Sequence, residues 1–573
     1  MPKTMKTNTF PTITDNDWER VARKSLKGRS LASLQTETYE GITLKPLYTK
    51  AILEEEVGEK HETLLAAIRA QKRDAAWTIA QCSYADSAEE YIREMQQLLA
   101  SGNEAVVYDG SHRLDWTDET VQELANLIRT YPVYAWNVAS DDRFVDVFSL
   151  IPEEERQHVT GIVSSRDELP NHFGHVRTEL VNIVPAHLRG ADAVFELALS
   201  LAYAEDAARE YASFDELLRK IAVRFAVDTH FFIELAKLRA FRVLWNMFCS
   251  AYDVHKGQRI PVIVETSLRS YTKMDPYVNM LRSGNEAFAA VLGGADVLTV
   301  HPHSVLTEVN EVAARYAKNI QLVIREETFA NKVVDPAGGS YFIDTLTNEL
   351  IERAWELFLT IVDVGGVQEY EASGALAERL EKTRSKRLEH LFTRKSSLIG
   401  TNIYADPDEI IDATERLEVT GRLAKPYERL RLAFQANKPK VSLLAFGELK
   451  DAKPLFDFVT GFIAPCGVAV REEKLFQTVA EMTDWLNKAS DDYSIVCFPP
   501  SIEQSFKENL RVSFPRGKWV DVAQMSFTEE EKERWKEAGV AGFYYRGKHQ
   551  LTKLEDVYRR WERLKGGDVD DET

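Results

Sequence analysis

The sequence has few cysteines, no long apolar run and no excess of basic side chains. Its four cysteines, Cys82, Cys249, Cys466 and Cys497, are too far apart along the 573 residues for a disulfide framework or for the paired spacing of a zinc site. No apolar run reaches the ~18–20 residues that span a bilayer, and residues 1–11 are polar, without the apolar core of a secretory signal. These absences predict a cytoplasmic protein with reduced thiols, no structural metal and no membrane partner.

The charge balance is acidic. The chain has 90 aspartates and glutamates against 71 lysines and arginines, a formal net charge of −19. Such a surface repels nucleic-acid phosphates and anionic lipid, so we expect no nucleic-acid partner. With 44% hydrophobic and 28% charged residues the composition is that of a folded globular protein, and its length predicts two to four domains.

Short apolar or β-branched runs alternate with longer amphipathic stretches through the first two thirds of the chain. This alternation predicts parallel strands joined by helices, and eight such units predict a closed (β/α)8 barrel. The predicted helices include 87–100, 117–129 and 276–292, and the long interval 185–260 is predicted to be a helical insertion. The eight predicted strands are 76–82, 104–109, 132–137, 159–164, 180–185, 260–266, 296–301 and 320–325.

Five further strand-like runs, each followed by a helix-like stretch, lie in the last part of the chain. They predict a flavodoxin-like, doubly wound sheet. We therefore expect an N-terminal arm at 1–75 that wraps the barrel or a partner, or adds a helix layer; a barrel at 76–392; a linker or belt at 393–438; and the doubly wound domain at 439–573. The five predicted strands are 441–446, 468–472, 493–498, 519–522 and 541–545.

Catalytic residues of a barrel lie at the carboxyl ends of its strands. His187 is the best candidate acid, because a histidine that follows an apolar strand can titrate near neutral pH and donate a hydrogen bond to a carbonyl. A hydrogen-bonded structural role is the alternative for this histidine. The full set of candidates at these positions is Asp109, Asn137, Ser164, His187, Thr266, His301 and Glu326 or Glu327.

Two polar clusters admit simpler interpretations. His301 and His303 are two residues apart, so in extended chain their side chains point in opposite directions, and no third ligand is suitably spaced; we predict no metal site. Arg325, Glu326 and Glu327 follow the predicted eighth strand. They either bind a polar ligand or form a charge pair that closes the barrel rim.

Several motifs in order along the chain resemble the methylmalonyl-CoA mutase family. The resemblance extends to residues 41–49 near the start, to His187 with Ala191, to 399–402 and to the last five βα units, so it spans nearly the whole chain. The motifs that carry it are FFIELAKLRAFRVLW at 231–245, ETS at 265–267, DPY at 275–277, AAVLGG at 289–294 and DPAGGSY at 335–341.

This resemblance implies radical isomerisation of acyl-CoA thioesters. Homolysis of the cobalt–carbon bond of adenosylcobalamin starts the reaction, with substrate inside the barrel and the corrin on a flavodoxin-like domain. Family members ligate cobalt through a DxHxxG loop, in which aspartate orients the histidine and glycine permits close corrin approach.

In this chain the residues that the family uses for chemistry are replaced. Leu449, Asp451 and Pro454 stand at the aspartate, histidine and glycine positions of the DxHxxG loop, and WVDVA at 519–523 replaces a glycine pair near the corrin. Lys72, Ala75 and Ala80 replace the active-site tyrosine and two arginines, and the arginine that clamps the substrate carboxylate has no counterpart. His187 is the only family-matched catalytic candidate that remains.

An intact scaffold without either chemical centre resembles the small, non-catalytic subunit of heterodimeric bacterial methylmalonyl-CoA mutases. The resemblance implies that this chain binds no cofactor or metal and stabilises a catalytic large subunit that holds adenosylcobalamin. Two alternatives remain open. The chain is itself an active acyl-CoA mutase, or it is a stand-alone acyl-CoA-binding or assembly protein that retains a contact with acyl-CoA.

Overall fold

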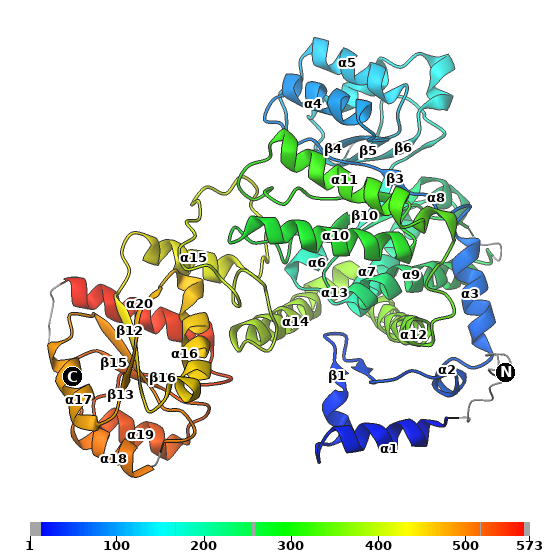
Figure 1. Cartoon of the computed structure of the whole chain (residues 1–573). Coiled ribbons are helices and arrows are strands. Elements are labelled where there is room, and N and C mark those ends of the chain that lie inside the picture. The colour runs from blue at the N-terminus through cyan, green and yellow to red at the C-terminus, as the bar shows by residue number, and fades with distance from the viewer. Residues whose placement is uncertain (1–12, 167, 255–257, 503, 516, 567–573) are drawn as a thin grey trace, which may run out of the picture.

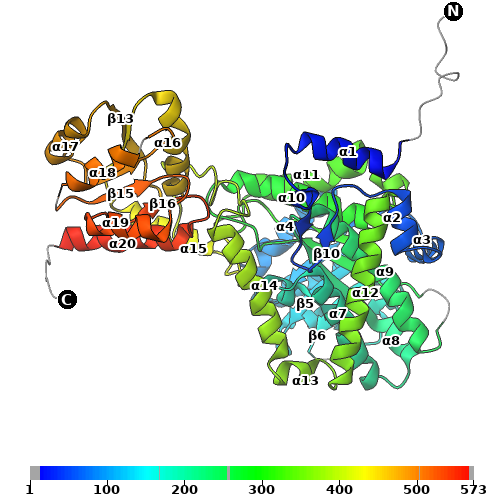
Figure 2. The ribbon, with the colours of Figure 1, turned by 90° about the horizontal axis from the view of Figure 1, so that it is seen from below.

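The computed structural model describes residues 13–166, 168–254, 258–502, 504–515 and 517–566 (Figures 1 and 2). The polar segment 1–11 discussed above lies outside this part of the chain. The fold is α/β: apart from one two-stranded ribbon, every strand pairing within the described residues is parallel. None of the described helices is both long enough and apolar enough to cross a bilayer.

The N-terminal arm begins with a helix that is only loosely attached to the rest. Helix α1 (Asp15–Ser25) begins with a Thr14–Asp17 capping box and buries none of its side chains. Strands β1 (Thr36–Glu37) and β2 (Thr43–Leu44) form the antiparallel ribbon. Two helices follow, α2 (Lys50–Glu56) and α3 (Lys60–Ala70), which pack on helices of the main body.

Nine parallel strands form two sheets after the arm. Both are built from short runs with buried side chains, as the alternating pattern predicts. The first has the order β3 (Thr78–Ile79), β11 (Val297–Thr299), β10 (Val262–Thr266), β9 (Ile221–Val227) and β8 (Glu179–Asn182). The second has the order β4 (Val106–Asp109), β5 (Val133–Val138), β6 (Gly161–Ser165) and β7 (Val176–Arg177).

The two sheets adjoin along both edges and enclose one core. Near β3 and β4 the backbone N–H of Glu104 donates to the carbonyl of Ile79 at 2.9 Å, and at the other edge β6 lies beside β8. Side chains from both sheets fill the enclosed space, so it is packed rather than open. This inner core comprises Ala80, Ala105, Val107, Tyr134, Trp136, Ile162, Ala222, Ile263 and Val297.

Helices cover the outer faces of these sheets (Figure 2). The predicted helices 87–100, 117–129 and 276–292 are confirmed, and the side chains of Ser87 and Thr117 cap the first two. The largest hydrophobic core lies between the first sheet and α7, α9 and α12. The main covering helices are α4 (Ala88–Ala100), α5 (Asp118–Ile128), α7 (Ala193–Glu210), α9 (Phe231–Ala251), α10 (Pro276–Gly293), α11 (Glu311–Glu327) and α12 (Tyr341–Asp363).

One predicted strand is wrong, and a real strand was missed. Residues 320–325 lie within helix α11, whose buried residues Ala313, Ala317, Gln321 and Ile324 recur at helical spacing. The missing strand is β9, inside the interval predicted to be wholly helical. All seven of its residues are buried, and a strand buried on both faces lacks the alternation that distinguishes it from a helix.

This correction also moves the charged triplet that follows 320–325. Arg325 is on α11 and donates to Glu104 Oε1 at 2.6 Å and to the carbonyl of Trp77 at 2.6 Å. Both partners precede strands, so the ion pair lies at the amino ends of β3 and β4. The charge pair predicted for Arg325 exists, but it lies at the edge of the sheets opposite to the carboxyl ends of the strands. Glu326 and Glu327 are exposed on α11 rather than at strand ends.

The last part of the chain is a five-stranded parallel sheet between two helix layers, which confirms the five strands predicted there. Its order is β13-β12-β14-β15-β16. The strands are β12 (Val441–Phe446), β13 (Val470–Phe476), β14 (Tyr493–Cys497), β15 (Val520–Ala523) and β16 (Phe543–Tyr544). The helices are α16 (Leu449–Ile463), α17 (Val479–Lys488), α18 (Gln504–Val512), α19 (Glu529–Glu537) and α20 (Gln550–Gly566).

The connection between the two halves runs from α14 (Ala375–Phe392) through irregular chain to α15 (Lys425–Gln435). Residues 414–423 of this connection are here called the strap. They cross the carboxyl ends of the strands in the first two sheets. Buried Arg422 pairs with Glu428 Oε2 at 2.7 Å, which anchors the end of the strap to α15. Tyr427 then donates to Gln550 Oε1 at 2.8 Å, joining α15 to α20.

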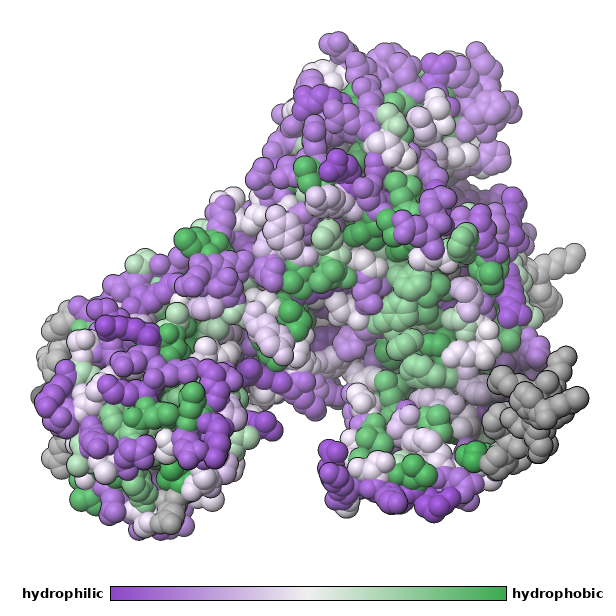
Figure 3. Space-filling model, in the orientation of Figure 1, coloured by the Kyte–Doolittle hydropathy of each residue, from purple (hydrophilic) through white to green (hydrophobic). Residues whose placement is uncertain are grey.

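The surface differs between the helices of the main body. Figure 3 shows hydrophobic residues gathered over the central helices α9, α10 and α12, whereas α4 and α5 above them are mostly hydrophilic. Exposed apolar side chains on the central helices include Phe232, Leu281 and Tyr341. An apolar face of this kind is typical of a surface that another protein covers.

Candidate functional site

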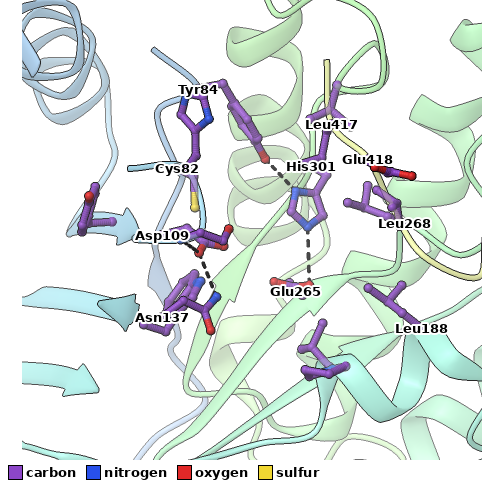
Figure 4. Close-up of a pocket in the computed structure, with 18 of the residues that line it drawn as sticks. Cys82, Tyr84, Asp109, Asn137, Leu188, Glu265, Leu268, His301, Leu417 and Glu418 are labelled. Atoms are coloured by element: carbon purple, nitrogen blue, oxygen red, sulfur yellow. Dashed lines mark hydrogen bonds and ion pairs between the residues drawn. The ribbon is translucent and has the colours of Figure 1, made fainter. Parts of the chain in front are cut away.

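A cavity of about 380 Å³ lies at the carboxyl ends of the strands of the main body (Figure 4). Side chains after β3, β4, β5, β8, β10 and β11 form most of its wall, as expected where parallel strands end together. The strap supplies the rest through residues 416–420. The polar residues that line the cavity include Cys82, Tyr84, Asp109, Asn137, Asn182, Arg224, Glu265 and His301.

A buried ion pair forms the floor. Arg224 projects from β9 to Glu265 at the end of β10, and its guanidinium carbon lies 4.0 Å from the ring centroid of Trp136. Burial acts to raise the pKa of Glu265, but Arg224 and His301 outweigh it and hold this pKa at about 2. Glu265 is therefore ionised at neutral pH, and its carboxylate forms an ion pair with the guanidinium of Arg224.

His301 stands between a tyrosine and this ion pair. Its Nδ1 lies 2.6 Å from the hydroxyl of Tyr84, and its backbone N–H donates to Thr266 Oγ1 at 2.9 Å. Its Nε2 makes no hydrogen bond and lies 3.6 Å from Glu265 Oε1. Figure 4 shows the row Tyr84, His301 and Glu265 along one side of the cavity. One ring nitrogen of a nearly buried histidine thus remains available to a ligand.

Asp109 and Asn137 form the opposite side. Asn137 Nδ2 donates to Asp109 Oδ1 at 2.9 Å, and the N–H of Ser111 donates to the same oxygen at 3.0 Å. Asn137 has φ of 58°, a left-handed conformation that asparagine tolerates better than most residues. Its carbonyl packs against Gly110, where a Cβ would lie 2.5 Å from that oxygen. The backbone here is therefore fixed so that the amide faces the carboxylate.

His187 does not line the cavity. It is fully buried on α6 (Val184–Arg189), with Nδ1 2.7 Å from Glu196 Oε1 and Nε2 2.7 Å from Ser267 Oγ. Burial, reinforced by Arg269, lowers the pKa of His187 to about 4. The imidazole is neutral at pH 7, so it donates from Nδ1 to the carboxylate and accepts from the serine. Both ring nitrogens are occupied behind the cavity wall.

The structure brings together three of the predicted strand-end residues, Asp109, Asn137 and His301. Thr266 lies behind His301, Ser164 is not part of the lining, and Lys72 lies at the amino end of β11, bonded to the carbonyl of Ala295. The sequence reasoning did not identify Tyr84, Arg224 or Glu265 as cavity residues. Arg224 carried a usable signal: it is the single charged side chain in the apolar run 221–227.

His303 lies outside the cavity that His301 lines. Its ring stacks on Tyr277 with centroids 5.2 Å apart, outside the cavity. Across the described ranges of the chain, no three histidine, cysteine, aspartate or glutamate side chains are grouped so that they could hold a metal ion.

The strap is held tightly over the cavity. Arg416 donates to the carbonyl of Tyr84 and pairs with Asp86 Oδ1 at 2.9 Å, while buried Val419 packs on the apolar wall. Gly421 has φ of 78°, and a Cβ at this position would lie 1.9 Å from the carbonyl oxygen of Leu188. Only glycine fits here without displacing the strap.

We therefore expect Gly421→Ala to loosen the strap and destabilise the protein by about 1–3 kcal/mol, through backbone strain and the steric clash. Limited proteolysis should then cut the chain near residue 416 faster than in the unaltered protein. Gly517→Ala is the control, since Gly517 also has positive φ but has open space around it. Equal cutting of both variants would contradict the tight fit of Gly421.

A second region of interest follows β12. Helix α16 begins at Leu449, only three residues after the strand ends at Phe446, so there is no extended loop between them. Leu449 and Asp451 are exposed in the first turn, and Pro454 lies within the helix.

The space between the C-terminal sheet and α20 is filled by a polar cluster. Asp521 is fully buried and accepts from Lys553 and from the hydroxyl of Tyr493, which lies 2.6 Å away. The Tyr493 and Tyr544 hydroxyls are 2.7 Å apart, and Trp519 stacks on Tyr493 with centroids 4.1 Å apart. Large side chains thus occupy this interior completely.

Comparison with known proteins gives concordant matches. The sequence profile of the methylmalonyl-CoA mutase family matches residues 170–490. The chain is 28% identical to the methylmalonyl-CoA mutase of Cereibacter sphaeroides over 69% of this chain and 65% of that protein. It is 30% identical to the methylmalonyl-CoA mutase small subunit of Porphyromonas gingivalis, over 49% of each chain.

A third relative is the probable methylmalonyl-CoA mutase small subunit of Mycobacterium tuberculosis H37Rv, 34% identical over 49% of this chain and 48% of that one. The matches thus span about half of the two small subunits and just under two thirds of the Cereibacter protein. Both full-length mutases and small subunits are therefore similar to this chain.

Proposed function

This chain belongs to the methylmalonyl-CoA mutase family, and from that premise we propose that it acts in the cytoplasm as a non-catalytic small subunit. In this proposal it stabilises a catalytic large subunit, which holds adenosylcobalamin and interconverts methylmalonyl-CoA and succinyl-CoA. The arm at 1–75 and the strap-bearing linker at 393–438 flank a (β/α)8 barrel at 76–392. A flavodoxin-like domain at 439–573 completes the scaffold.

The order and contacts of the strands support this architecture. β3, β4, β5, β6, β8, β9, β10 and β11 follow one another around the inner core, and β11 returns to pair with β3. The C-terminal order, with the first strand second from one edge, is the flavodoxin-like order.

The observation that carries the proposal is the start of α16. The position where family members present the cobalt-ligating histidine holds Asp451, an exposed carboxylate in the first helical turn. A carboxylate is a hard oxygen donor rather than the imidazole nitrogen of the family. The helix begins so soon after β12 that no loop projects above the sheet to reach a cobalt ion.

The interior beside α20 supports the same conclusion. The buried cluster of Asp521, Lys553, Tyr493 and Tyr544 leaves no space for a nucleotide tail between the sheet and the helix. The residues present therefore do not fit adenosylcobalamin, and we assign this chain no step of the radical reaction.

The cavity is also poorly suited to the family's substrate. A methylmalonyl group carries a free carboxylate, which needs an unoccupied cation. Arg224 is engaged by Glu265, Arg416 is engaged by Asp86, and Arg189 is exposed to solvent at the rim, while Asp109 adds a second carboxylate. The packed inner core blocks passage of a long thioester between the sheets. His187, the remaining family-matched candidate, is buried with both nitrogens bonded.

Co-expression with a catalytic large subunit tests the proposal. Size-exclusion chromatography with ultraviolet–visible detection should show a one-to-one complex, with cobalamin absorbance and mutase activity following the large chain after separation. The apolar face over α10 is the expected contact, so Leu281→Asp should weaken co-elution, whereas Leu564→Asp on α20 should not; both leucines are exposed.

Two results would replace the proposal by an alternative. Stoichiometric cobalamin or turnover of methylmalonyl-CoA by this chain alone would make it an active mutase. Saturable acyl-CoA binding without any stable complex would make it a stand-alone binding protein.

A further inference from the structure

We propose that the cavity at the carboxyl ends of the strands binds a small protonated amine with an apolar body. This class of ligand is opposite in charge to the acyl thioesters of the family. The inference rests on the side chains that line the cavity and holds whether or not the chain is a small subunit.

Asp109 carries a charge that no neighbouring cation of the described residues compensates. Its carboxylate accepts hydrogen bonds from the amide of Asn137 and the N–H of Ser111, both neutral donors. Within the described part of the chain Asp109 forms no ion pair, whereas Glu265 across the cavity is neutralised by Arg224. One negative charge therefore faces the cavity without a partner, and an ammonium group would supply one.

Cys82, which lines the same cavity, reports on the electrostatic environment there. Burial raises the pKa of this thiol, and Asp109 and Glu265 raise it further, while Arg224 counteracts them only in part. A negative charge is therefore disfavoured where the thiol stands, first by burial and then by the two carboxylates, and only the contribution of the carboxylates would favour a positive charge. The exposed Arg189 at the rim is screened by solvent and does not reverse this balance.

His301 is only 8% exposed, yet one of its ring nitrogens has no hydrogen-bond partner among the described residues. Nε2 makes no hydrogen bond and faces Glu265 across 3.6 Å. Nδ1 is occupied by the hydroxyl of Tyr84, so Nε2 is the ring nitrogen that faces the cavity without a hydrogen-bond partner from the described chain. The N–H groups of an ammonium ion on this side of the cavity can donate to the carboxylate of Glu265, and on the opposite side they can donate to that of Asp109.

The remaining wall defines the rest of the ligand. Leu188, Leu268 and Val305 line it from the main body, and Leu417 and Val419 line it from the strap. Apolar carbon on the ligand would bury against these side chains. The volume of about 380 Å³ lies at the lower end of the range for small-molecule sites, which suits a compact amine.

Isothermal titration calorimetry on the full chain tests the charge preference. The probes are 2-phenylethylamine and hexylamine, with 2-phenylethanol as the neutral analogue and 3-phenylpropionate as the anionic one. We expect at least one amine to bind with one-to-one stoichiometry, and the alcohol and the carboxylate to bind at least tenfold more weakly.

Variants then locate the site. Asp109→Asn keeps an acceptor for Asn137 and Ser111 but removes the charge, so amine affinity should fall at least tenfold while alcohol binding is unchanged. Leu417→Trp should fill the cavity and abolish binding of both. Asp363→Asn, which removes an exposed carboxylate at the end of α12, is the matched control and should bind as the unaltered protein does.

Three results would overturn the inference. The first is binding of 3-phenylpropionate that is as tight as binding of the amines. The second is no amine binding to protein that circular dichroism shows to be folded. The third is amine binding that Asp109→Asn leaves unchanged. None of them bears on cobalamin or on the one-to-one complex, so the proposed function stands or falls separately.

Discussion

Replacing Arg239 by methionine is expected to lower the free energy of unfolding by about 3–5 kcal/mol. Arg239 is fully buried on α9. Its Nε donates to Asp335 Oδ1 at 2.7 Å, its Nη2 to Asp344 Oδ1 at 2.8 Å and its Nη1 to Thr347 Oγ1 at 2.8 Å. Methionine matches the length of the side chain but removes the guanidinium from two buried carboxylates, leaving Asp335 with Arg69 at 3.9 Å and Asp344 with His61 at 2.8 Å.

This cluster joins two of the motifs that carry the family resemblance, since Arg239 lies in 231–245 and Asp335 begins 335–341. Urea unfolding followed by circular dichroism gives the loss of stability, and hydrogen exchange of the α9 amides localises it. Arg113→Met is the matched control, because Arg113 pairs with Asp141 at the surface, where such pairs contribute ~1 kcal/mol or less. A loss below about 1 kcal/mol for Arg239→Met would show that the buried cluster is not needed for stability.

The second large effect is a pH dependence that originates at His187. Its pKa is about 4 in the folded chain against 6.5 in the unfolded chain, so the unfolded state binds more protons between these values. The stabilising contribution of neutral His187 is complete above pH 6.5 and is lost as the pH falls towards 4. At 1.36 kcal/mol per unit, the loss amounts to about 3 kcal/mol.

His187→Gln should remove this dependence. Glu234, whose pKa burial raises to about 7, acts in the opposite direction in the same cluster, so the quantity to follow is the difference in stability between the variant and the unaltered protein. Urea midpoints at pH 4.5, 5.5, 6.5 and 7.5 should bring the two proteins closer together as the pH falls. His172→Gln at an exposed position is the control. A constant difference across the series would mean that His187 does not titrate between the folded and unfolded states as inferred.

Most secondary structure followed from local pattern. Helix α4 begins directly after Ser87 and α5 directly after Thr117, because these hydroxyls cap the first turn ahead of an amphipathic repeat. β12 has the predicted bounds, 441–446, because its six apolar or small residues are followed directly by a glycine turn.

Local pattern failed where burial is complete. β9 is buried along its whole length and lies between helices, so the run 221–227 was absorbed into a predicted helical insertion. Conversely, residues 320–325 were predicted to be a strand, although Ala317, Gln321 and Ile324 form the buried stripe of α11. The first error could not be corrected from nearby residues, because strand partners are fixed by pairing across the sheet. The second could, because the helical spacing of the buried stripe in α11 is a local signal.

The sequence by itself determined the α/β class, the family and the loss of the DxHxxG residues, because these depend on residue identity and on spacing within short segments. The tertiary structure alone decided that Arg224 neutralises Glu265, that His187 lies behind the cavity wall and that the strap closes the cavity. Residues 224 and 265 lie on neighbouring strands, and 416–420 reaches strand ends more than a hundred residues earlier in the chain. The charge of the cavity is set by contacts between distant segments, and such contacts exist only once the sheets have formed.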